Sequence, residues 1–239
     1  MSNISVELVN YQVEGQTFQG RLVFRKDITE KQPGLLMTPN WMGATDDAVT
    51  LVTPVVEKGY AVFIADLYGE GVRPTNAEEA TAAMMSVRDQ PAERLRTQAA
   101  LDALLSQQIV AVDKEKVAAF GFCFGGHNVL ELARSGADLK AFVSFHGSLD
   151  TTDTAGAKNI KGAVLVLHGA SDPLVPDEQV QTFVKEMKAQ NIDWQLVSFG
   201  GAVHSFTDPH ANAPGFSQYN EKVSKRAFDA MFQLFEEVL

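Results

Sequence analysis

Five short, almost uninterrupted apolar runs restrict the fold of this chain more than any other feature. They lie at residues 34–37, 61–65, 117–120, 141–145 and 163–167. Strands that are buried on both faces have this pattern, whereas strands with one solvated face alternate between apolar and polar residues. Segments with helical periodicity separate most of these runs, and a repeated strand–helix order is typical of a mostly parallel sheet with helices on both faces. The sequence therefore predicts the α/β class.

The remaining elements complete this pattern. Segments 4–8 and 18–24 predict antiparallel strands and 194–199 a last strand, for about eight strands in all. Helices are predicted at 46–58, 92–107, 128–134, 177–190 and 217–239. Residues 73–90 give no clear pattern, and such segments often cover an active site. A chain of 239 residues with 45% hydrophobic residues can bury one large core, so we expect a single domain over 1–239.

Charge and apolar run length exclude several kinds of partner. The net charge of −10 opposes binding to nucleic-acid backbones and anionic membranes. No apolar run approaches the roughly 18 residues that a membrane helix needs. A single cysteine fits a reducing compartment, and we expect a cytoplasmic protein that binds a small molecule. The sequence leaves a monomer and a homodimer as alternatives.

The segment 121–126, Gly-Phe-Cys-Phe-Gly-Gly, contains the only cysteine of the chain. It lies between the predicted strand at 117–120 and the predicted helix at 128–134. A nucleophile flanked by glycines in a sharp strand-to-helix turn is the nucleophile elbow of α/β-hydrolases. The glycines let the turn close while the nucleophile takes a strained backbone conformation. We therefore expect Cys123 to be the nucleophile of a hydrolase.

A cysteine nucleophile needs a base, and α/β-hydrolases carry nucleophile, acid and base in that chain order. Asp172 follows the strand at 163–167, and His204 follows the strand at 194–199. Both positions lie at carboxyl ends of strands, where open α/β sheets bind ligands. His210 is an alternative base, and the alternative acids are Asp150, Asp153 and Asp177.

The other histidines do not indicate a metal site. His127, His146 and His168 lack the spacing of metal ligands, and we expect them in the core or behind the site. The elbow is also not a dinucleotide-binding motif. No cofactor and no metal are therefore expected.

With these residues identified, the chain resembles the dienelactone hydrolase family over almost its whole length. The family motif G-x-C-x-G-G matches residues 121–126, and Asp66-Leu67-Tyr68 also fits. The resemblance implies an α/β-hydrolase fold and hydrolysis of carboxylic esters or lactones through an acyl-thioester intermediate. It implies that Asp172 orients His204, which acts on the Cys123 thiol and later on water.

The resemblance also implies an oxyanion hole and substrate contacts. The backbone N–H groups of Phe124 and Trp41 are the expected oxyanion donors, each typically worth about 2.7 to 4 kcal/mol in the transition state. The candidate substrate-binding residues are Asn40, Met42, Ser205 and Phe206.

Two positions depart from the family pattern. Asn40 stands where the archetypal enzymes have a glutamate that contacts the resting cysteine, so activation of the thiol depends more on His204. Thr207-Asp208 stands where an arginine holds the substrate carboxylate. A substrate carboxylate about 4 Å from Asp208 would be repelled by about 4 kcal/mol at an effective dielectric of about 20. The chain is thus expected to prefer more neutral, apolar or aromatic substrates than dienelactone. The alternative is that an arginine from elsewhere, Arg73, Arg88 or Arg94, approaches a substrate carboxylate.

Two alternative functions remain. A neutral phosphotriester needs no arginine, and promiscuous phosphotriesterases with a dienelactone-hydrolase-like fold exist, so phosphotriester hydrolysis by the same triad is one alternative. The other is a non-catalytic protein that keeps the fold and binds a ligand or partner, as Asn40 in place of the glutamate allows.

Overall fold

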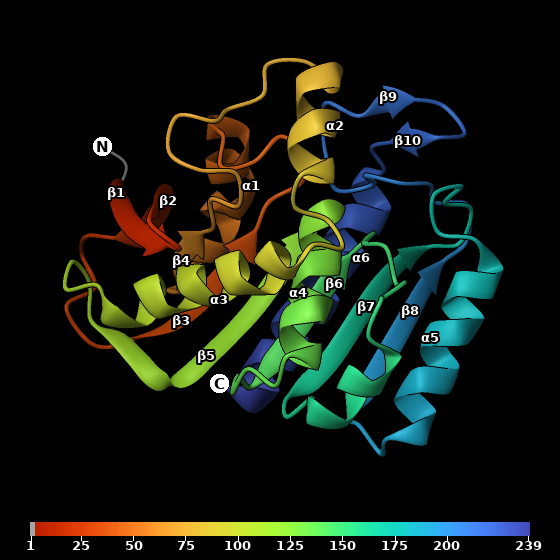
Figure 1. Ribbon diagram of the computed structural model, residues 1–239. Helices are drawn as coiled ribbons and strands as arrows, with labels where there is room; N and C mark the ends of the chain where they lie inside the picture. The colour runs from red at the N-terminus through yellow and green to blue at the C-terminus, as the bar shows by residue number, and fades with distance from the viewer. Residues whose placement is uncertain (1–2) are drawn as a thin grey trace. The chain divides into compact units, whose positions relative to one another are not determined.

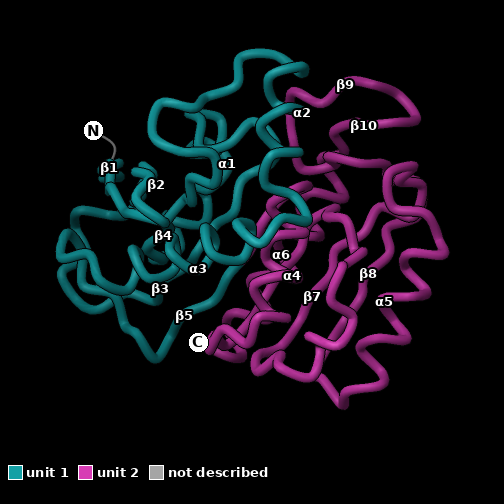
Figure 2. The backbone as a smooth tube through the Cα atoms, in the orientation of Figure 1, with its two compact units in different colours: residues 1–119, 239 teal, residues 120–238 magenta. Residues whose placement is uncertain are grey.

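The computed structural model describes residues 3–239, which form two compact units. Unit 1 extends to Ala119 and includes Leu239, and unit 2 comprises Phe120–Val238 (Figure 2). The single domain that the sequence indicates stays a prediction.

Within residues 3–239 the main sheet has eight strands in the order β1-β2-β4-β3-β5-β6-β7-β8 (Figure 1). Their bounds are β1 Ile4–Val13, β2 Gln16–Arg25, β3 Gln32–Thr38, β4 Ala61–Ile64, β5 Val112–Phe122, β6 Ala141–Phe145, β7 Ala163–Gly169 and β8 Trp194–Phe199. β1 and β2 are antiparallel, as are β2 and β4, whereas the β3–β4, β6–β7 and β7–β8 pairs are parallel. The predicted mostly parallel α/β architecture is confirmed.

In unit 1, helices pack on the antiparallel strands and on β3. α1 (Asp46–Glu57) contacts β2 and β4, and α3 (Pro91–Ser106) contacts β1 and β3. The side chain of Thr45 accepts a hydrogen bond from the Ala48 N–H at 3.4 Å and so caps α1. The hairpin of β1 and β2 pairs over its full length from Ile4–Arg25 to Val13–Gln16.

In unit 2, helices cover both faces of the parallel strands. α4 (Phe124–Arg134) lies in front of β6 in Figure 1 and α6 (Glu221–Val238) behind it. On the α6 face, the ring centroid of Phe228 lies 5.0 Å from that of Phe145 and 6.0 Å from that of Phe122. On the other face, α4 and α5 (Asp177–Ala189) pack on β7 through a cluster that includes Leu130, Val164, Val166, Phe183 and Met187.

A fully buried arginine joins the two helices on that face. Arg134 of α4 binds both carboxylate oxygens of Glu186 on α5, with Nε–Oε1 and Nη2–Oε2 distances of 2.8 Å. Its Nη1 also donates to Glu131 at 2.9 Å. Because three charged side chains satisfy one another, the network can be buried, and it holds the helix that follows Cys123.

The structure differs from the sequence-based prediction at several places. α4 begins at Phe124 rather than at Asn128, because Gly125 and Gly126 already lie in its first turn. Residues 73–90 contain α2 (Ala77–Met85), whose N-cap residue Asn76 accepts a hydrogen bond from the Glu79 N–H at 3.0 Å. The terminal helix begins at Glu221 rather than at Ser217, because Ser217–Gln218 forms β10 and pairs with β9 (Asn212–Ala213). This short hairpin has no counterpart in the predicted elements.

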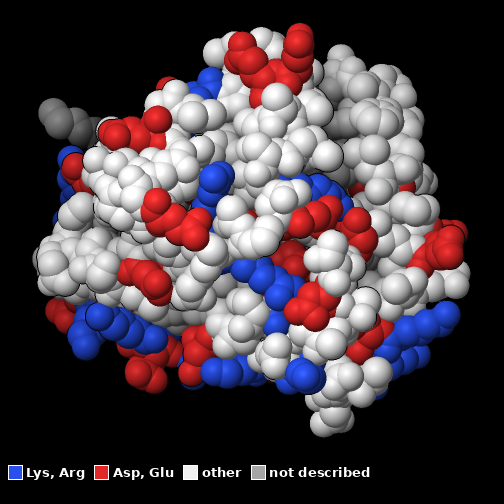
Figure 3. All heavy atoms as spheres, viewed as in Figure 1, with Lys and Arg blue, Asp and Glu red and all other residues white. Residues whose placement is uncertain are grey.

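Figure 3 shows how the charges are distributed on one face of the molecule. Small groups of Lys and Arg along the lower margin of this view are interrupted by acidic side chains. Among the helices of residues 3–239, none combines the length and apolar character needed to cross a membrane.

Candidate active site

Cys123 occupies a strained turn between β5 and α4. Its backbone has φ 55° and ψ −120°, a conformation that is rare for residues other than glycine. The Cys123 N–H donates to the Phe145 carbonyl at 3.0 Å, and its carbonyl accepts from the His127 N–H at 3.2 Å. These bonds to the end of β6 and to the first turn of α4 hold the strained conformation. The side chain is partly exposed.

Close packing of α4 on β6 explains part of the glycine pattern. A Cβ atom at Gly126 would lie 2.6 Å from Ser144 Oγ, closer than real Cβ contacts, and 3.0 Å from Gly147 Cα, tighter than most of them. A Cβ atom at Gly147 would likewise lie 2.7 Å from the Gly126 carbonyl carbon. The two glycines therefore let the first turn of α4 rest directly on the end of β6. Gly126 belongs to the recognised motif, whereas Gly147 shows no sequence signal of its own.

Three predicted side chains meet in unit 2. His204 Nε2 lies 3.0 Å from Cys123 Sγ, and His204 Nδ1 lies 2.8 Å from Asp172 Oδ2. The other Asp172 oxygen, Oδ1, accepts a hydrogen bond from the Leu174 N–H at 2.9 Å. Asp172 and His204 are only 5% and 6% exposed. Each oxygen of the buried Asp172 carboxylate has a hydrogen-bond partner, and the two partners together fix the orientation of the carboxylate.

The electrostatics of the site favour a protonated imidazole. Burial alone would lower the pKa of His204, but hydrogen bonds to Asp172 and Cys123 and the charges of these groups outweigh it and raise the pKa to about 10. His204 is then protonated at neutral pH, between the Asp172 and Cys123 side chains. Cys123 also precedes the first residue of α4, where the helix dipole stabilises negative charge.

A short hairpin fixes the loop that carries His204. His204 forms an isolated parallel bridge with Ser217 of β10, and its carbonyl accepts from the Gln218 N–H at 3.0 Å. The Phe206 carbonyl accepts from the Asn220 N–H at 3.0 Å. Sequence reasoning missed this support, because a two-residue strand leaves no periodic signal.

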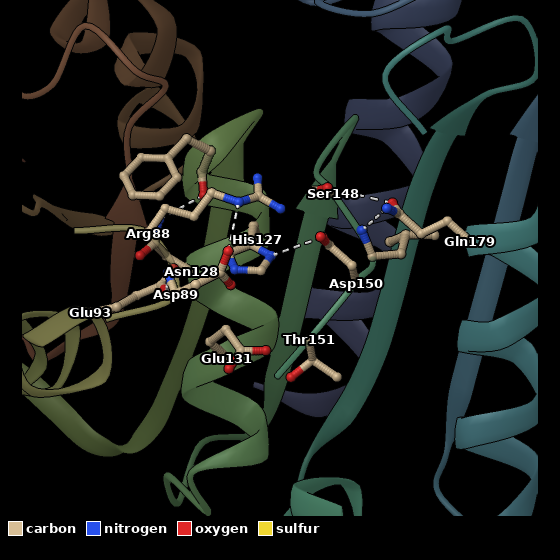
Figure 4. A network of polar contacts seen from close by, with 12 residues as sticks. Arg88, Asp89, Glu93, His127, Asn128, Glu131, Ser148, Asp150, Thr151 and Gln179 are labelled. Carbon is tan, nitrogen blue, oxygen red and sulfur yellow. Dashed lines mark hydrogen bonds and ion pairs between the residues drawn. The ribbon is translucent and has the colours of Figure 1, made fainter. Parts of the chain in front are cut away.

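The alternative acids and base lie in other surroundings. Figure 4 shows His127 pointing from α4 toward Asp150, with Nδ1 and Oδ1 3.7 Å apart. Asp177 lies in the first turn of α5, and Asp153 precedes the 3₁₀ helix at Thr154–Asn159. His210 is exposed. The acid that the structure brings to His204 is Asp172.

The two predicted substrate-binding residues that follow His204 differ in their exposure to solvent. Ser205 is partly exposed and has a left-handed backbone with φ 53°. Phe206 is fully buried and packs against His146 and Phe199, with ring centroids 4.9 and 5.7 Å apart. This burial speaks against the predicted substrate contact by Phe206, whose ring instead supports the loop. Phe124 is also buried, and its predicted role uses the backbone N–H alone.

In unit 1, the turn after β3 holds the remaining predicted residues, all partly exposed. Asn40 Oδ1 accepts a hydrogen bond from the Met42 N–H at 3.0 Å, so the residue in the family glutamate position closes its own turn. Tyr68 Oη donates to the Trp41 carbonyl at 2.8 Å. The Tyr68 N–H in turn donates to the buried Asp66 carboxylate at 3.0 Å. The Asp66-Leu67-Tyr68 segment therefore holds the turn that contains Trp41.

A known protein family and several known proteins and solved structures resemble this chain in sequence or fold. A model of the dienelactone hydrolase family matches residues 18–239. The solved structure m3DLH is 38% identical with a TM-score of 0.93, and all of both chains is covered. The dienelactone hydrolase-like promiscuous phosphotriesterase P91 from metagenomic libraries is 36% identical with a TM-score of 0.91 over 99% of each chain. A carboxymethylenebutenolidase homolog of Mus musculus is 30% identical over 107 residues, 44% of this chain and 43% of that protein.

Proposed function

The chain belongs to the dienelactone hydrolase family, and we propose that it hydrolyses carboxylic esters or lactones through an acyl-thioester on Cys123. One observation carries this proposal: the continuous path from Asp172 through His204 to Cys123, with distances of 2.8 and 3.0 Å, at a strained strand-to-helix turn. A nucleophile, a base and a group that orients the base form the constellation needed for nucleophilic catalysis.

In the proposed reaction, the Cys123 thiolate attacks the carbonyl carbon of the substrate, and the carbonyl oxygen becomes an oxyanion. As the tetrahedral intermediate collapses, the bond to the leaving oxygen breaks and His204 donates its proton to that oxygen. Water then attacks the acyl-thioester while His204 takes its proton, and expulsion of the thiolate restores the imidazolium–thiolate pair. Asp172 keeps His204 oriented through both steps.

Backbone groups complete the proposed site. Phe124 begins α4, and its N–H is the first of the helix amides that face an anion at this helix end. In unit 1, Asn40 and Tyr68 hold the turn that contains Trp41, the residue whose N–H the sequence predicts as the second donor. Donors fixed before the reaction stabilise the oxyanion without reorganisation in the transition state.

Asn40 shifts thiol activation toward His204. A neutral amide cannot take the thiol proton as the family glutamate could, and its oxygen is already bound to the Met42 N–H. The raised pKa of His204, about 10, supports transfer of the Cys123 thiol proton to the His204 imidazole.

The direct test compares the wild type with Cys123→Ala. We expect the wild type to hydrolyse short aryl esters and to lose this activity after alkylation with iodoacetamide. The Cys123→Ala variant should be inactive although folded. Full turnover by that variant would disprove the mechanism, and a thiol that does not label would favour the non-catalytic alternative.

Phosphotriester hydrolysis is the second candidate, and its support is the 36% identity to the promiscuous phosphotriesterase over 99% of each chain. Thr207-Asp208 also lacks the cation that would select an anionic substrate. Parallel measurements of kcat/KM for an aryl ester and a neutral aryl phosphotriester rank the two activities. A larger kcat/KM for the ester supports the main proposal.

A further inference from the structure

His146 has an unfavourable environment that its packing alone does not explain. It follows β6 with φ 39°, a left-handed conformation that costs energy for a residue with a Cβ atom. The side chain is buried. Strained backbone conformations persist only where the surrounding structure holds them and they cluster at functional sites, so a strained, buried histidine beside His204 points to a role other than stability.

The contacts of His146 converge on the loop that carries His204. His146 Nε2 and Thr207 Oγ1 lie 2.8 Å apart, and both side chains are buried. The His146 ring meets the His204 ring at 67° with 5.2 Å between centroids, and it meets the Phe206 ring at 84° with 4.9 Å. One side chain therefore contacts three of the four residues from His204 to Thr207.

The anchor of His146 also supports Cys123. The His146 N–H donates to the Leu167 carbonyl at 2.8 Å, and the preceding carbonyl, that of Phe145, accepts the Cys123 N–H at 3.0 Å. The end of β6 thus holds the backbone of Cys123 and, one residue later, the ring against His204. A shift at this point would change the distance between Sγ and Nε2.

Asp172 holds His204 only at Nδ1. Its Nε2 lies 3.0 Å from Cys123 Sγ, and a contact on the ring edge or face would add a further constraint on the plane of the imidazole. The edge-to-face contact with His146 is such a contact. Burial and the charge of His204 hold the pKa of His146 well below its usual range, so the ring stays neutral and does not repel the imidazolium.

We propose that His146 is a positioning residue, which fixes the His204 ring and, through Thr207, its loop in the orientation that places Nε2 against Cys123 Sγ. This inference rests on the proposed function, because it concerns the alignment of the same three side chains. It assigns a role to a buried histidine that touches neither the substrate nor the reacting atoms.

The test uses Thr207→Val, His146→Phe and the double variant that combines them. The double variant replaces a polar pair with an apolar pair of similar shape, which can be neutral or stabilising for the fold. We expect it to melt no lower than the wild type, yet kcat for an aryl ester should fall by about tenfold or more with KM within about twofold, because small misplacements of reacting groups are costly. The rate of Cys123 alkylation at pH 6 should fall in parallel.

A matched control is His210→Phe, which replaces an exposed histidine and should keep the wild-type kcat. If His146→Phe does not fold, Thr207→Val still removes the hydrogen bond alone and should lower kcat in the same direction. Wild-type kcat and alkylation in the double variant would overturn the inference. Recovery of activity in the double variant after loss in His146→Phe would also overturn it, because it would indicate packing alone. A failure of the proposed function would show in a different experiment, as ester turnover by the Cys123→Ala variant.

Discussion

Replacing Asp172 with Asn tests whether a buried carboxylate maintains the proposed imidazolium–thiolate pair of His204 and Cys123. The substitution keeps the size of the side chain and removes one charge 2.8 Å from His204 Nδ1. At this distance and an effective dielectric of about 20, the attraction between unit charges is about 6 kcal/mol. The raised pKa of His204, about 10, corresponds to about 5 kcal/mol in favour of the protonated form, shared between the Asp172 and Cys123 contacts.

Without the carboxylate, burial opposes protonation of His204 with less compensation, and the proton returns to the thiol. An ordinary thiol with a pKa of about 8.5 is about 0.3% thiolate at pH 6. We therefore expect iodoacetamide to alkylate Asp172→Asn about 10²-fold more slowly than the wild type at pH 6, with the difference narrowing as the pH rises. Ester turnover should fall by about 10³-fold or more, because the Asn amide also favours the wrong imidazole tautomer.

The assay is the rate of thiol labelling between pH 5 and 10, followed by intact mass. Asp150→Asn is the matched control, since Asp150 faces His127 rather than His204, and it should label at the wild-type rate. Equal labelling rates of Asp172→Asn and the wild type at pH 6 would show that the Asp172 carboxylate does not maintain the reactive form of Cys123.

Three further predictions concern stability and pH. Gly126→Ala should lower the free energy of unfolding by about 1 to 3 kcal/mol in urea titrations through overpacking, whereas Gly200→Ala, with no atom within 4 Å of the added Cβ, should stay within about 0.5 kcal/mol. Arg134→Ala leaves buried carboxylates without their cation and should cost about 3 to 5 kcal/mol, against at most about 1 kcal/mol for the exposed Lys225→Ala, by the same titrations. The pKa of His204 is raised to about 10, so its protonation stabilises the folded protein fully below about pH 6.5, and this contribution is lost as the pH rises through 10. Between pH 6.5 and 10 the free energy of unfolding should therefore fall more in the wild type than in His204→Gln. Equal losses in the two proteins would contradict this assignment.

The sequence predicts the sheet and the elbow because both leave local patterns. Parallel strands such as β6 and β7 are apolar throughout, and the glycines around Cys123 mark a turn whose conformation they allow. The proximity of Asp172 and His204 was predictable because each directly follows a strand, and a parallel sheet brings such positions together.

Features that depend on distant pairs were not predictable in the same way. The contact between His146 and Thr207 joins residues 61 positions apart, and the left-handed backbone of His146 has no glycine to mark it. The β9–β10 hairpin has strands of two residues each, too short for a periodic pattern. Phe206 illustrates the converse, because an apolar residue beside a predicted base can face the core instead of the substrate.

The proposed reaction requires a covalent acyl intermediate on Cys123. The most direct measurement is the intact mass of the protein quenched in acid shortly after mixing with a short-chain aryl ester, followed by peptide mapping. The proposed mechanism predicts a transient mass increase equal to one acyl group on the peptide that contains Cys123, and no adduct in Cys123→Ala. Steady ester turnover with no adduct on that peptide, or with an adduct on another residue, would contradict it.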